Sequence, residues 1–225
     1  MIKNKNLTIA FILFTVWLYG AWAAVELLLM PVISGAINNQ YAIVLIRDLL
    51  IKNLVWTLPA LLLIKRFSED MLIGMKELLS FRRESLKYLL IAAALAVFVL
   101  GGVILRTHGL ALSSSFHPSK LIVALLVGFT EETVFRGFFL NATLKHDDSE
   151  PKKYIAVAVN AVMFLAIHFP VWISSGVFAA NLTSFSFVTI IVLSALFSFC
   201  LMRCRNIWVA VILHSFYDLL VFMFV

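Results

Sequence analysis

The feature that most constrains this chain is a succession of seven long apolar runs separated by short polar segments. The runs occupy roughly residues 7–33, 43–64, 88–105, 120–143, 154–173, 185–202 and 207–225. A helix needs about 20 apolar residues to cross a bilayer. The 225 residues are 63% hydrophobic and 13% charged, and no soluble core of this size could cover so much apolar surface. We therefore expect an all-α, polytopic membrane helix bundle of about seven transmembrane helices, forming a single membrane domain over residues 1–225.

The charge of the segments between the runs predicts the orientation of the bundle. Lys and Arg concentrate before the first run and in segments 65–87, 144–153 and 203–206, whereas the intervening segments carry a single Arg. Because cytoplasmic loops are enriched in basic residues, we expect a cytoplasmic N-terminus. The same rule explains the net charge of +6 without nucleic-acid binding. The small size and basic cytoplasmic face favour a bacterial cell membrane.

Three details of the N-terminal half need interpretation. The run behind Lys3 and Lys5 lacks a clear cleavage site, so we interpret it as a retained span rather than a signal peptide. Arg47, Asp48 and Lys52 crowd the start of the second run, so an interfacial turn followed by a span from about Asn53 is the alternative to a span over 43–64. Residues 67–80 mix apolar and charged positions at helical spacing, which indicates a short interfacial helix.

The fourth run contains three ionisable residues, Glu131, Glu132 and Arg136. An ionisable group near the centre of a bilayer costs about 2.5–3.5 kcal/mol on insertion scales, so each one needs a partner or a function. Glu132 and Arg136 are four residues apart, with the acid first, and are expected to pair on one helix face. Glu131 points about 100° away from that face and can meet other helices.

The last runs add two histidines and a further carboxylate. His168 ends the string FLAIH, while His214 and Asp218 are four residues apart, so that the carboxylate can orient the imidazole. Because separate burial of these groups in lipid would be costly, we expect them to share a hydrated cavity with Glu131. Glu26, in the first run, is interpreted as a residue that forms hydrogen bonds within the bundle.

Three short strings together resemble an enzyme family. EETVFR (131–136), FLAIH (164–168) and HSFYD (214–218) are similar to the EExxxR, FxxxH and HxxxN/D motifs of the CAAX-protease and bacteriocin-processing intramembrane proteases, also called the abortive-infection family. The resemblance covers residues 120–225, which it implies are the catalytic core. Residues 1–119 are expected to form spans without a motif.

The resemblance implies an intramembrane endopeptidase that acts on a peptide or protein substrate, in peptide maturation or bacteriocin self-immunity. The implied catalytic residues are Glu131, Glu132, His168 and His214. The implied supporting residues are Arg136, Phe164 and Asp218. In this scheme Glu131 activates water with the help of His168, and His214 stabilises the oxyanion. Because a carboxylate donates a hydrogen bond only when protonated, Asp218 is better suited to orienting His214.

Two questions remain open at this level. Glu131, His168 and His214 could also bind a catalytic zinc with one position left for water, although no HExxH motif is present; we favour a site without a metal cofactor. A non-catalytic immunity or scaffold protein and a small transporter are the alternative functions. Prenylated, lipidated and double-glycine-type peptides are all candidate substrates.

Overall fold

The computed structural model describes residues 4–144, 148–184 and 186–225, and every regular element in these ranges is helical. Lys3 and Lys145, which contribute to the predicted loop charges, lie outside the described residues, as does residue 185 at the start of the sixth run. The elements in chain order are α1 (Lys5–Ala24), η1 (Val25–Leu29), α2 (Met30–Ala36), α3 (Gln40–Leu45), η2 (Ile46–Ile51), η3 (Asn53–Thr57), α4 (Leu58–Arg66), α5 (Met75–Leu78), η4 (Arg83–Leu90), α6 (Ile91–Thr107), α7 (Ser119–Glu132), η5 (Thr133–Leu140), α8 (Asn141–Thr143), α9 (Glu150–Ala166), α10 (Phe169–Ser174), α11 (Phe178–Thr183), α12 (Ser186–Cys204) and α13 (Trp208–Phe224).

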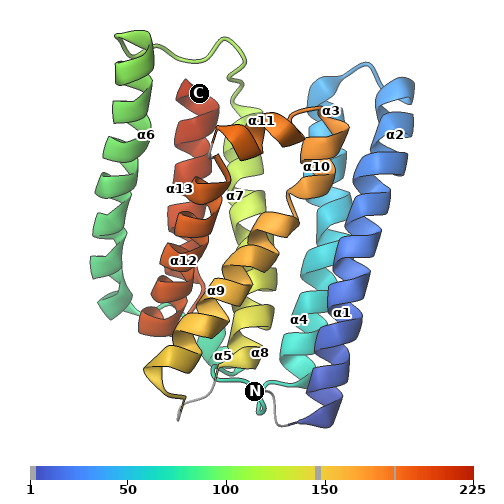
Figure 1. Cartoon of the computed structure of the whole chain (residues 1–225), viewed down its shortest axis with the longest axis vertical. Coiled ribbons are helices and arrows are strands. Elements are labelled where there is room, and N and C mark those ends of the chain that lie inside the picture. The colour runs from blue at the N-terminus through green and yellow to red at the C-terminus, as the bar shows by residue number, and fades with distance from the viewer. Residues whose placement is uncertain (1–3, 145–147, 185) are drawn as a thin grey trace.

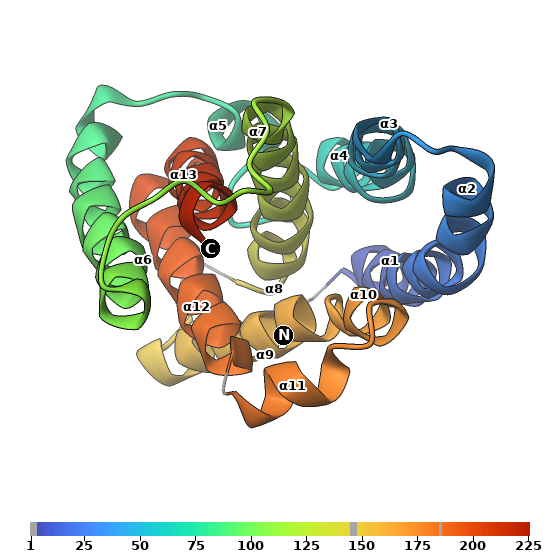
Figure 2. The same cartoon turned by 90° about the horizontal axis from the view of Figure 1, so that it is seen from above.

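These elements stand side by side as a helical bundle. In Figure 2, α6 lies at one edge and α1 and α2 lie towards the opposite edge, with α7 and α13 between them. The short helices α10 and α11 cross the upper end of the bundle in Figure 1. The helices α7 and α13, which carry Glu131, Glu132, His214 and Asp218, are thus interior elements.

Four of the described helices are long and apolar enough to cross a membrane: Lys5–Ala36, Arg83–Thr107, Glu150–Ser174 and Ser186–Cys204. The outward faces are apolar, as the 68% exposed Val16 and the 81% exposed Leu105 illustrate. With so much exposed apolar surface the protein is an integral membrane protein. The helix α13 is apolar but shorter, and the helical segments 40–66 and 119–143 carry the interior charges. Seven membrane crossings and a cytoplasmic N-terminus stay predictions.

The basic segments meet at one end of the bundle. In Figure 1, the start of α1, the end of α4, the start of α9 and the end of α12 all lie at the lower end. This grouping agrees with the alternation of loop charge in the sequence.

Several helices contain wider π-helical turns next to the interior. The segment η1 directly precedes the turn that holds Pro31, and η3 directly precedes the turn that holds Pro59. Proline lacks the N–H of a regular helical turn and its ring crowds the preceding turn, so the backbone must adjust there. These π segments keep helices 5–36 and 40–66 continuous and rotate polar residues such as Glu26 and Asp48 into buried positions.

Residues 67–80 do not form the interfacial helix that the sequence predicts. Only α5 is helical, and Met71 and Ile73 are buried under the bundle. The Asn141 side chain explains the difference, because its Oδ1 accepts from Ile73 N at 2.8 Å and its Nδ2 donates to Ile73 O at 2.8 Å. These bonds replace the helical bonds that Ile73 would otherwise make.

A surface ion pair holds the end of this segment against the last turn of the bundle. Arg205 Nε donates to Glu77 Oε1 at 2.8 Å and Nη2 donates to Glu77 Oε2 at 3.0 Å. Hydrogen bonding to Arg205 and its positive charge hold the pKa of Glu77 below the usual value. The pair therefore fixes α5 to the turn between α12 and α13.

The helices α7 and α13 approach each other closely at Gly128. A Cβ at this position would overlap Ser215 Oγ and would lie 3.1 Å from both Ser215 N and Val211 O. We expect Gly128→Ala to lower the free energy of unfolding by about 1–3 kcal/mol, the usual cost of overpacking. Thermal unfolding in detergent would measure the change.

Gly20→Ala is the matched control, because a Cβ at Gly20 in α1 would meet no atom within 4 Å. Alanine is the better helix former by up to about 1 kcal/mol, so this variant should be as stable as the wild type or more stable. Equal stability of the two variants would show that the α7–α13 contact is not close-packed.

Candidate active site

The adjacent residues Glu131 and Glu132, at the end of α7, are buried and point to different partners. Glu131 Oε1 accepts a hydrogen bond from Lys52 Nζ at 2.7 Å, and Oε2 lies 3.8 Å from His214 Nε2. Glu132 Oε1 lies 3.0 Å from Arg136 Nη1 and 2.8 Å from His214 Nδ1. As the helical geometry predicts, Glu132 pairs within its own helix while Glu131 faces other helices.

Arg136 is completely buried and joins three helices. Besides Glu132, it binds Ser194 of α12, with Nη2 donating to the backbone O at 3.0 Å and to Oγ at 2.8 Å. The guanidinium lies over the ring of Phe164 at 4.5 Å. The supporting role predicted for Arg136 therefore has a structural basis, because the cation anchors Glu132 and packs against α9 and α12.

His214 on α13 meets both glutamates and is oriented by Glu132. The Nδ1–Glu132 Oε1 distance of 2.8 Å is a hydrogen bond, whereas Nε2 lies 3.6 Å from Asp218 Oδ2. The ring therefore has two carboxylate neighbours, Glu132 at Nδ1 and Asp218 near Nε2, and the orienting role of Asp218 stays a prediction. Nε2 faces the carboxylates of Glu131 and Asp218.

His168 lies at the break between α9 and α10, where Pro170 begins a new helical turn. Its Nδ1 and the carbonyl O of Phe164 are 2.8 Å apart, so Nδ1–H donates to that carbonyl and Nε2 is left for another group. The Phe164 ring packs edge-on against both His168 and His214, with centroids 5.1 and 5.9 Å away. Phe164 is thus the apolar spacer between the two histidines.

The second helical segment supplies a residue that the sequence analysis placed outside the site. Residues 40–66 form a continuous helical run in which Lys52 lies roughly 18 Å from the first residue at 1.5 Å per residue. The helix therefore has no break near Asn53, and the residue at which it enters the membrane stays a prediction. A signal was present, because Asp48 and Lys52 have the same acid-then-base spacing of four as Glu132 and Arg136.

A small polar cavity of about 90 Å³ adjoins Glu131, with room for a few water molecules. Its lining includes Glu131, His168 and Lys52 together with Glu26 from η1. Oε1 of Glu26 is buried without a hydrogen-bond partner, so the expected bundle hydrogen bond to this atom is not formed. Four of the six ionisable residues that line the cavity thus come from the segments described in the sequence as lacking a motif.

The side chains were also tested as a zinc site. No three His, Cys, Asp or Glu side chains in the described ranges are grouped so that they could hold a metal ion. The Lys52 ammonium takes Glu131 Oε1, and His214 Nδ1 is taken by Glu132. Catalysis without a metal cofactor stays a prediction.

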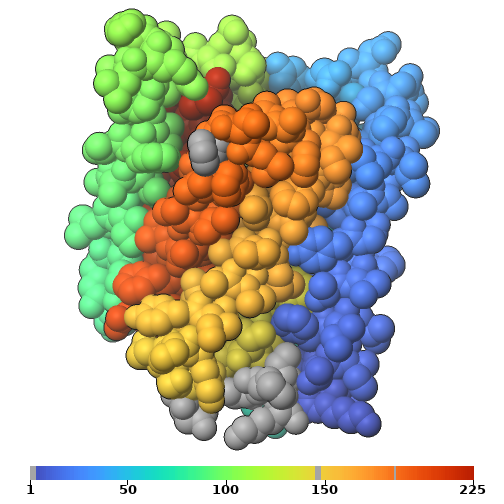
Figure 3. Space-filling model, viewed as in Figure 1, coloured from blue at the N-terminus to red at the C-terminus, as the bar shows by residue number. Residues whose placement is uncertain are grey.

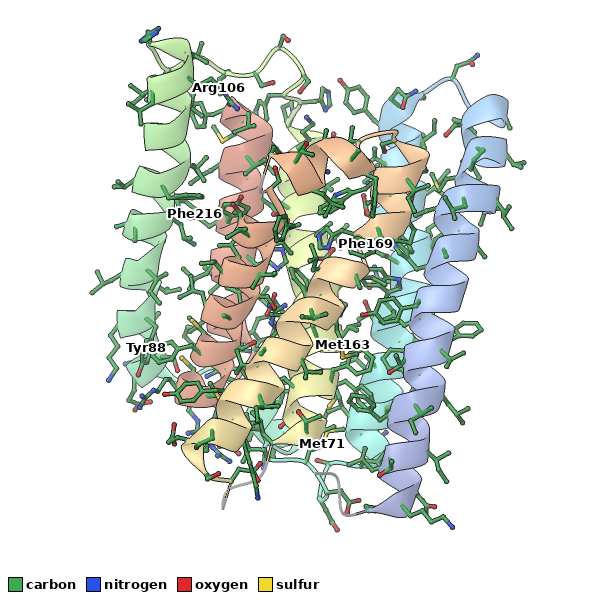
Figure 4. The ribbon with its side chains drawn as sticks, viewed as in Figure 1. Met71, Tyr88, Arg106, Met163, Phe169 and Phe216 are labelled. Atoms are coloured by element: carbon green, nitrogen blue, oxygen red, sulfur yellow. The ribbon has the colours of Figure 1, made fainter. Side chains whose placement is uncertain are left out.

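Figure 4 places the site within the height of the bundle. Met163 and Phe169, both labelled, lie on either side of the Phe164–His168 motif near the middle of the molecule, whereas Met71 lies near the lower end. Arg106 is labelled at the opposite, upper end of α6. His168, between the two labelled residues, thus lies away from both ends of the bundle.

The fold and this interior site define an integral membrane protein with a buried carboxylate–imidazole cluster. Residues 114–220, from before α7 into α13, match the family model described as type II CAAX prenyl endopeptidase Rce1-like. Over this segment, which is just under half of the chain, the sequence thus matches the CAAX protease family that its motifs resemble. Comparisons with curated proteins and with solved structures gave no match.

Proposed function

We propose that the protein is an intramembrane endopeptidase that hydrolyses a peptide bond with a glutamate-activated water and without a metal cofactor. The observation that carries the proposal is the convergence of side chains from three helical regions on Glu131. His214 Nε2 lies 3.8 Å from one carboxylate oxygen, and His168 lines the same water-sized cavity as Glu131. Ionisable side chains are rare in membrane-spanning helices, and those present usually mark a functional site.

The proposed reaction uses Glu131 as general base and then as general acid. Glu131 takes a proton from a water held with His168, while the water oxygen bonds to the scissile carbonyl carbon. The C=O electron pair moves to the oxygen, and His214 donates a hydrogen bond from Nε2 to this oxyanion. When the C=O bond re-forms, the C–N bond breaks and Glu131 returns the proton to the leaving amine.

An apolar groove supports a lipidated substrate for this chain. It has a volume of about 600 Å³ and is lined by Phe11 and Thr8 of α1 and by α9 from Lys152 to Met163. Figure 3 shows this face, with the surface of α9 beside that of α1. The site cavity lies farther along the same two helical regions, lined by Trp22 and His168.

A hydrogen bond joins α1 and α9 at the end of the groove that is nearer, along both helices, to the residues lining the site cavity. Tyr19 of α1 donates from its hydroxyl to the backbone O of Met163 at 2.6 Å. Because the family is described as a prenyl endopeptidase, we propose that the groove holds the isoprenoid chain of a prenylated cysteine. The peptide that follows the cysteine then reaches Glu131 past Tyr19. Roles in peptide maturation or bacteriocin self-immunity, and a bacterial membrane, stay predictions from the sequence.

Filling the groove tests this substrate assignment. We expect Ala156→Trp to raise the KM for a quenched fluorescent peptide with a farnesylated Cys-a-a-X end by about tenfold, because the indole occupies the position of the chain. Val162→Trp is the matched control, since Val162 is on the same helix, is 60% exposed and does not line the groove. Equal KM values for the two variants would contradict the assignment.

A further inference from the structure

The catalytic carboxylate is held by a cation from outside the matched segment. Lys52, between η2 and η3, belongs to the helical run 40–66, whereas the family match begins at residue 114. Its Nζ donates to Glu131 Oε1 at 2.7 Å. Both side chains are buried, with relative exposures of 8% for Lys52 and 7% for Glu131.

The Lys52 ammonium is fixed in place from several sides. Asp48 Oδ1 lies 3.8 Å from Nζ, and Arg47 Nη2 in turn lies 3.0 Å from Asp48 Oδ2. The ring centroids of Trp22 and Trp56 lie 5.5 and 4.8 Å from Nζ, at distances that favour a cation–π interaction. A flexible lysine side chain is therefore restricted to one position.

A gain in stability is a weak explanation for the burial of Lys52 and Glu131. Desolvation of two ions commonly offsets their attraction, and apolar residues of similar volume often serve as well or better. The same helix already contains an ion pair between Arg47 and Asp48. Lys52 differs from Arg47 in its partner, because Lys52 binds a carboxylate oxygen of Glu131, the proposed general base.

The geometry divides the two oxygens of Glu131 between two partners. Oε1 is hydrogen-bonded to Lys52, while Oε2 faces His214 Nε2 at 3.8 Å. The hydrogen bond on Oε1 restricts the rotamer of the Glu131 side chain and leaves Oε2 directed towards His214. Reaction rates are sensitive to such placement, and a displacement of about 1 Å can cost roughly 100-fold.

We propose that Lys52 is a positioning residue of the active site, which holds Glu131 by Oε1 so that Oε2 is presented to His214 and the attacking water. This proposal rests on the proposed endopeptidase function. It makes the helical segment 40–66 a required part of a site whose recognisable motifs all lie in residues 131–218.

Lys52→Met tests the role, because methionine retains the apolar stem and removes the ammonium. For the farnesylated peptide we expect kcat per folded protein to fall by about 100-fold, with KM within about twofold of the wild-type value. Lys65→Met, on the same helical run but exposed at its end, is the matched control and should keep wild-type kcat and KM. Wild-type kcat in folded Lys52→Met would overturn the proposal.

Chemical rescue separates positioning from a purely structural role. Lys52→Ala, prepared and assayed with n-propylammonium present throughout, should recover at least about tenfold in kcat, and n-propanol of similar size should not restore it. Equal rescue by the alcohol, or no rescue of folded protein by the amine, would contradict the proposal. Absence of cleavage by the wild type itself would instead refute the proposed function.

Discussion

Glu131→Gln should lower kcat for the farnesylated peptide by roughly 1,000-fold or more. The amide keeps the shape of the side chain but cannot accept the proton of the attacking water, and general base catalysis contributes about 10²–10⁴-fold. The amide oxygen can still accept the hydrogen bond that Lys52 Nζ makes with Oε1. The fluorescence assay on purified protein, with KM determined for each variant, measures the effect.

Glu150→Gln provides the control for this substitution. Glu150 is exposed at the start of α9 and pairs with the nearby Lys153, at 2.8 Å. We expect its kcat and KM to match the wild-type values. A Glu131→Gln protein that retains more than about a tenth of the wild-type kcat would exclude Glu131 as the general base.

Arg136→Met should have the largest effect on stability, lowering the free energy of unfolding by about 3–5 kcal/mol. The substitution removes the cation that binds Glu132 at 3.0 Å in a fully buried position and leaves that carboxylate without its charge partner. Thermal unfolding in detergent would measure the loss. Arg106→Met, at the exposed end of α6 (Figure 4), should change the stability by less than about 0.5 kcal/mol.

The double variant Glu132→Gln/Arg136→Met separates charge from packing. A glutamine at position 132 is neutral, and its Oε1 can still accept a hydrogen bond from His214 Nδ1. We therefore expect the double variant to be more stable than Arg136→Met, so that the mutant cycle gives a coupling energy of at least about 1 kcal/mol. Strict additivity of the two single effects would mean that the ion pair makes no specific contribution.

Much of the fold could be predicted because lipid imposes one rule on the whole chain. A backbone in an apolar environment must satisfy its own hydrogen bonds, so each long apolar run becomes a helix. The run predicted at 88–105 corresponds to the helical segment 83–107, and the run at 154–173 to α9 and α10. The course of residues 67–80 could not be predicted, since it depends on the tertiary bonds of Asn141.

The candidate site could be predicted only in part for a similar reason. Spacing along a helix reveals a local pair, and the pairing of Glu132 with Arg136 followed from it. The partners of Glu131 and His214 lie on other helices, at Lys52 and Glu132. The sequence interpretation placed Lys52 near a membrane interface because a charge in lipid is costly. That argument omits the Glu131 carboxylate, which compensates the charge of Lys52.

The most direct test of the account compares new peptide termini in membranes from cells that express the wild type or Glu131→Gln at matched levels. We predict a small set of termini found only with the wild type, each produced by cleavage directly after a lipid-modified cysteine. Identical termini in the two samples, under conditions in which the wild type has a phenotype, would contradict the endopeptidase assignment and favour a non-catalytic role or transport.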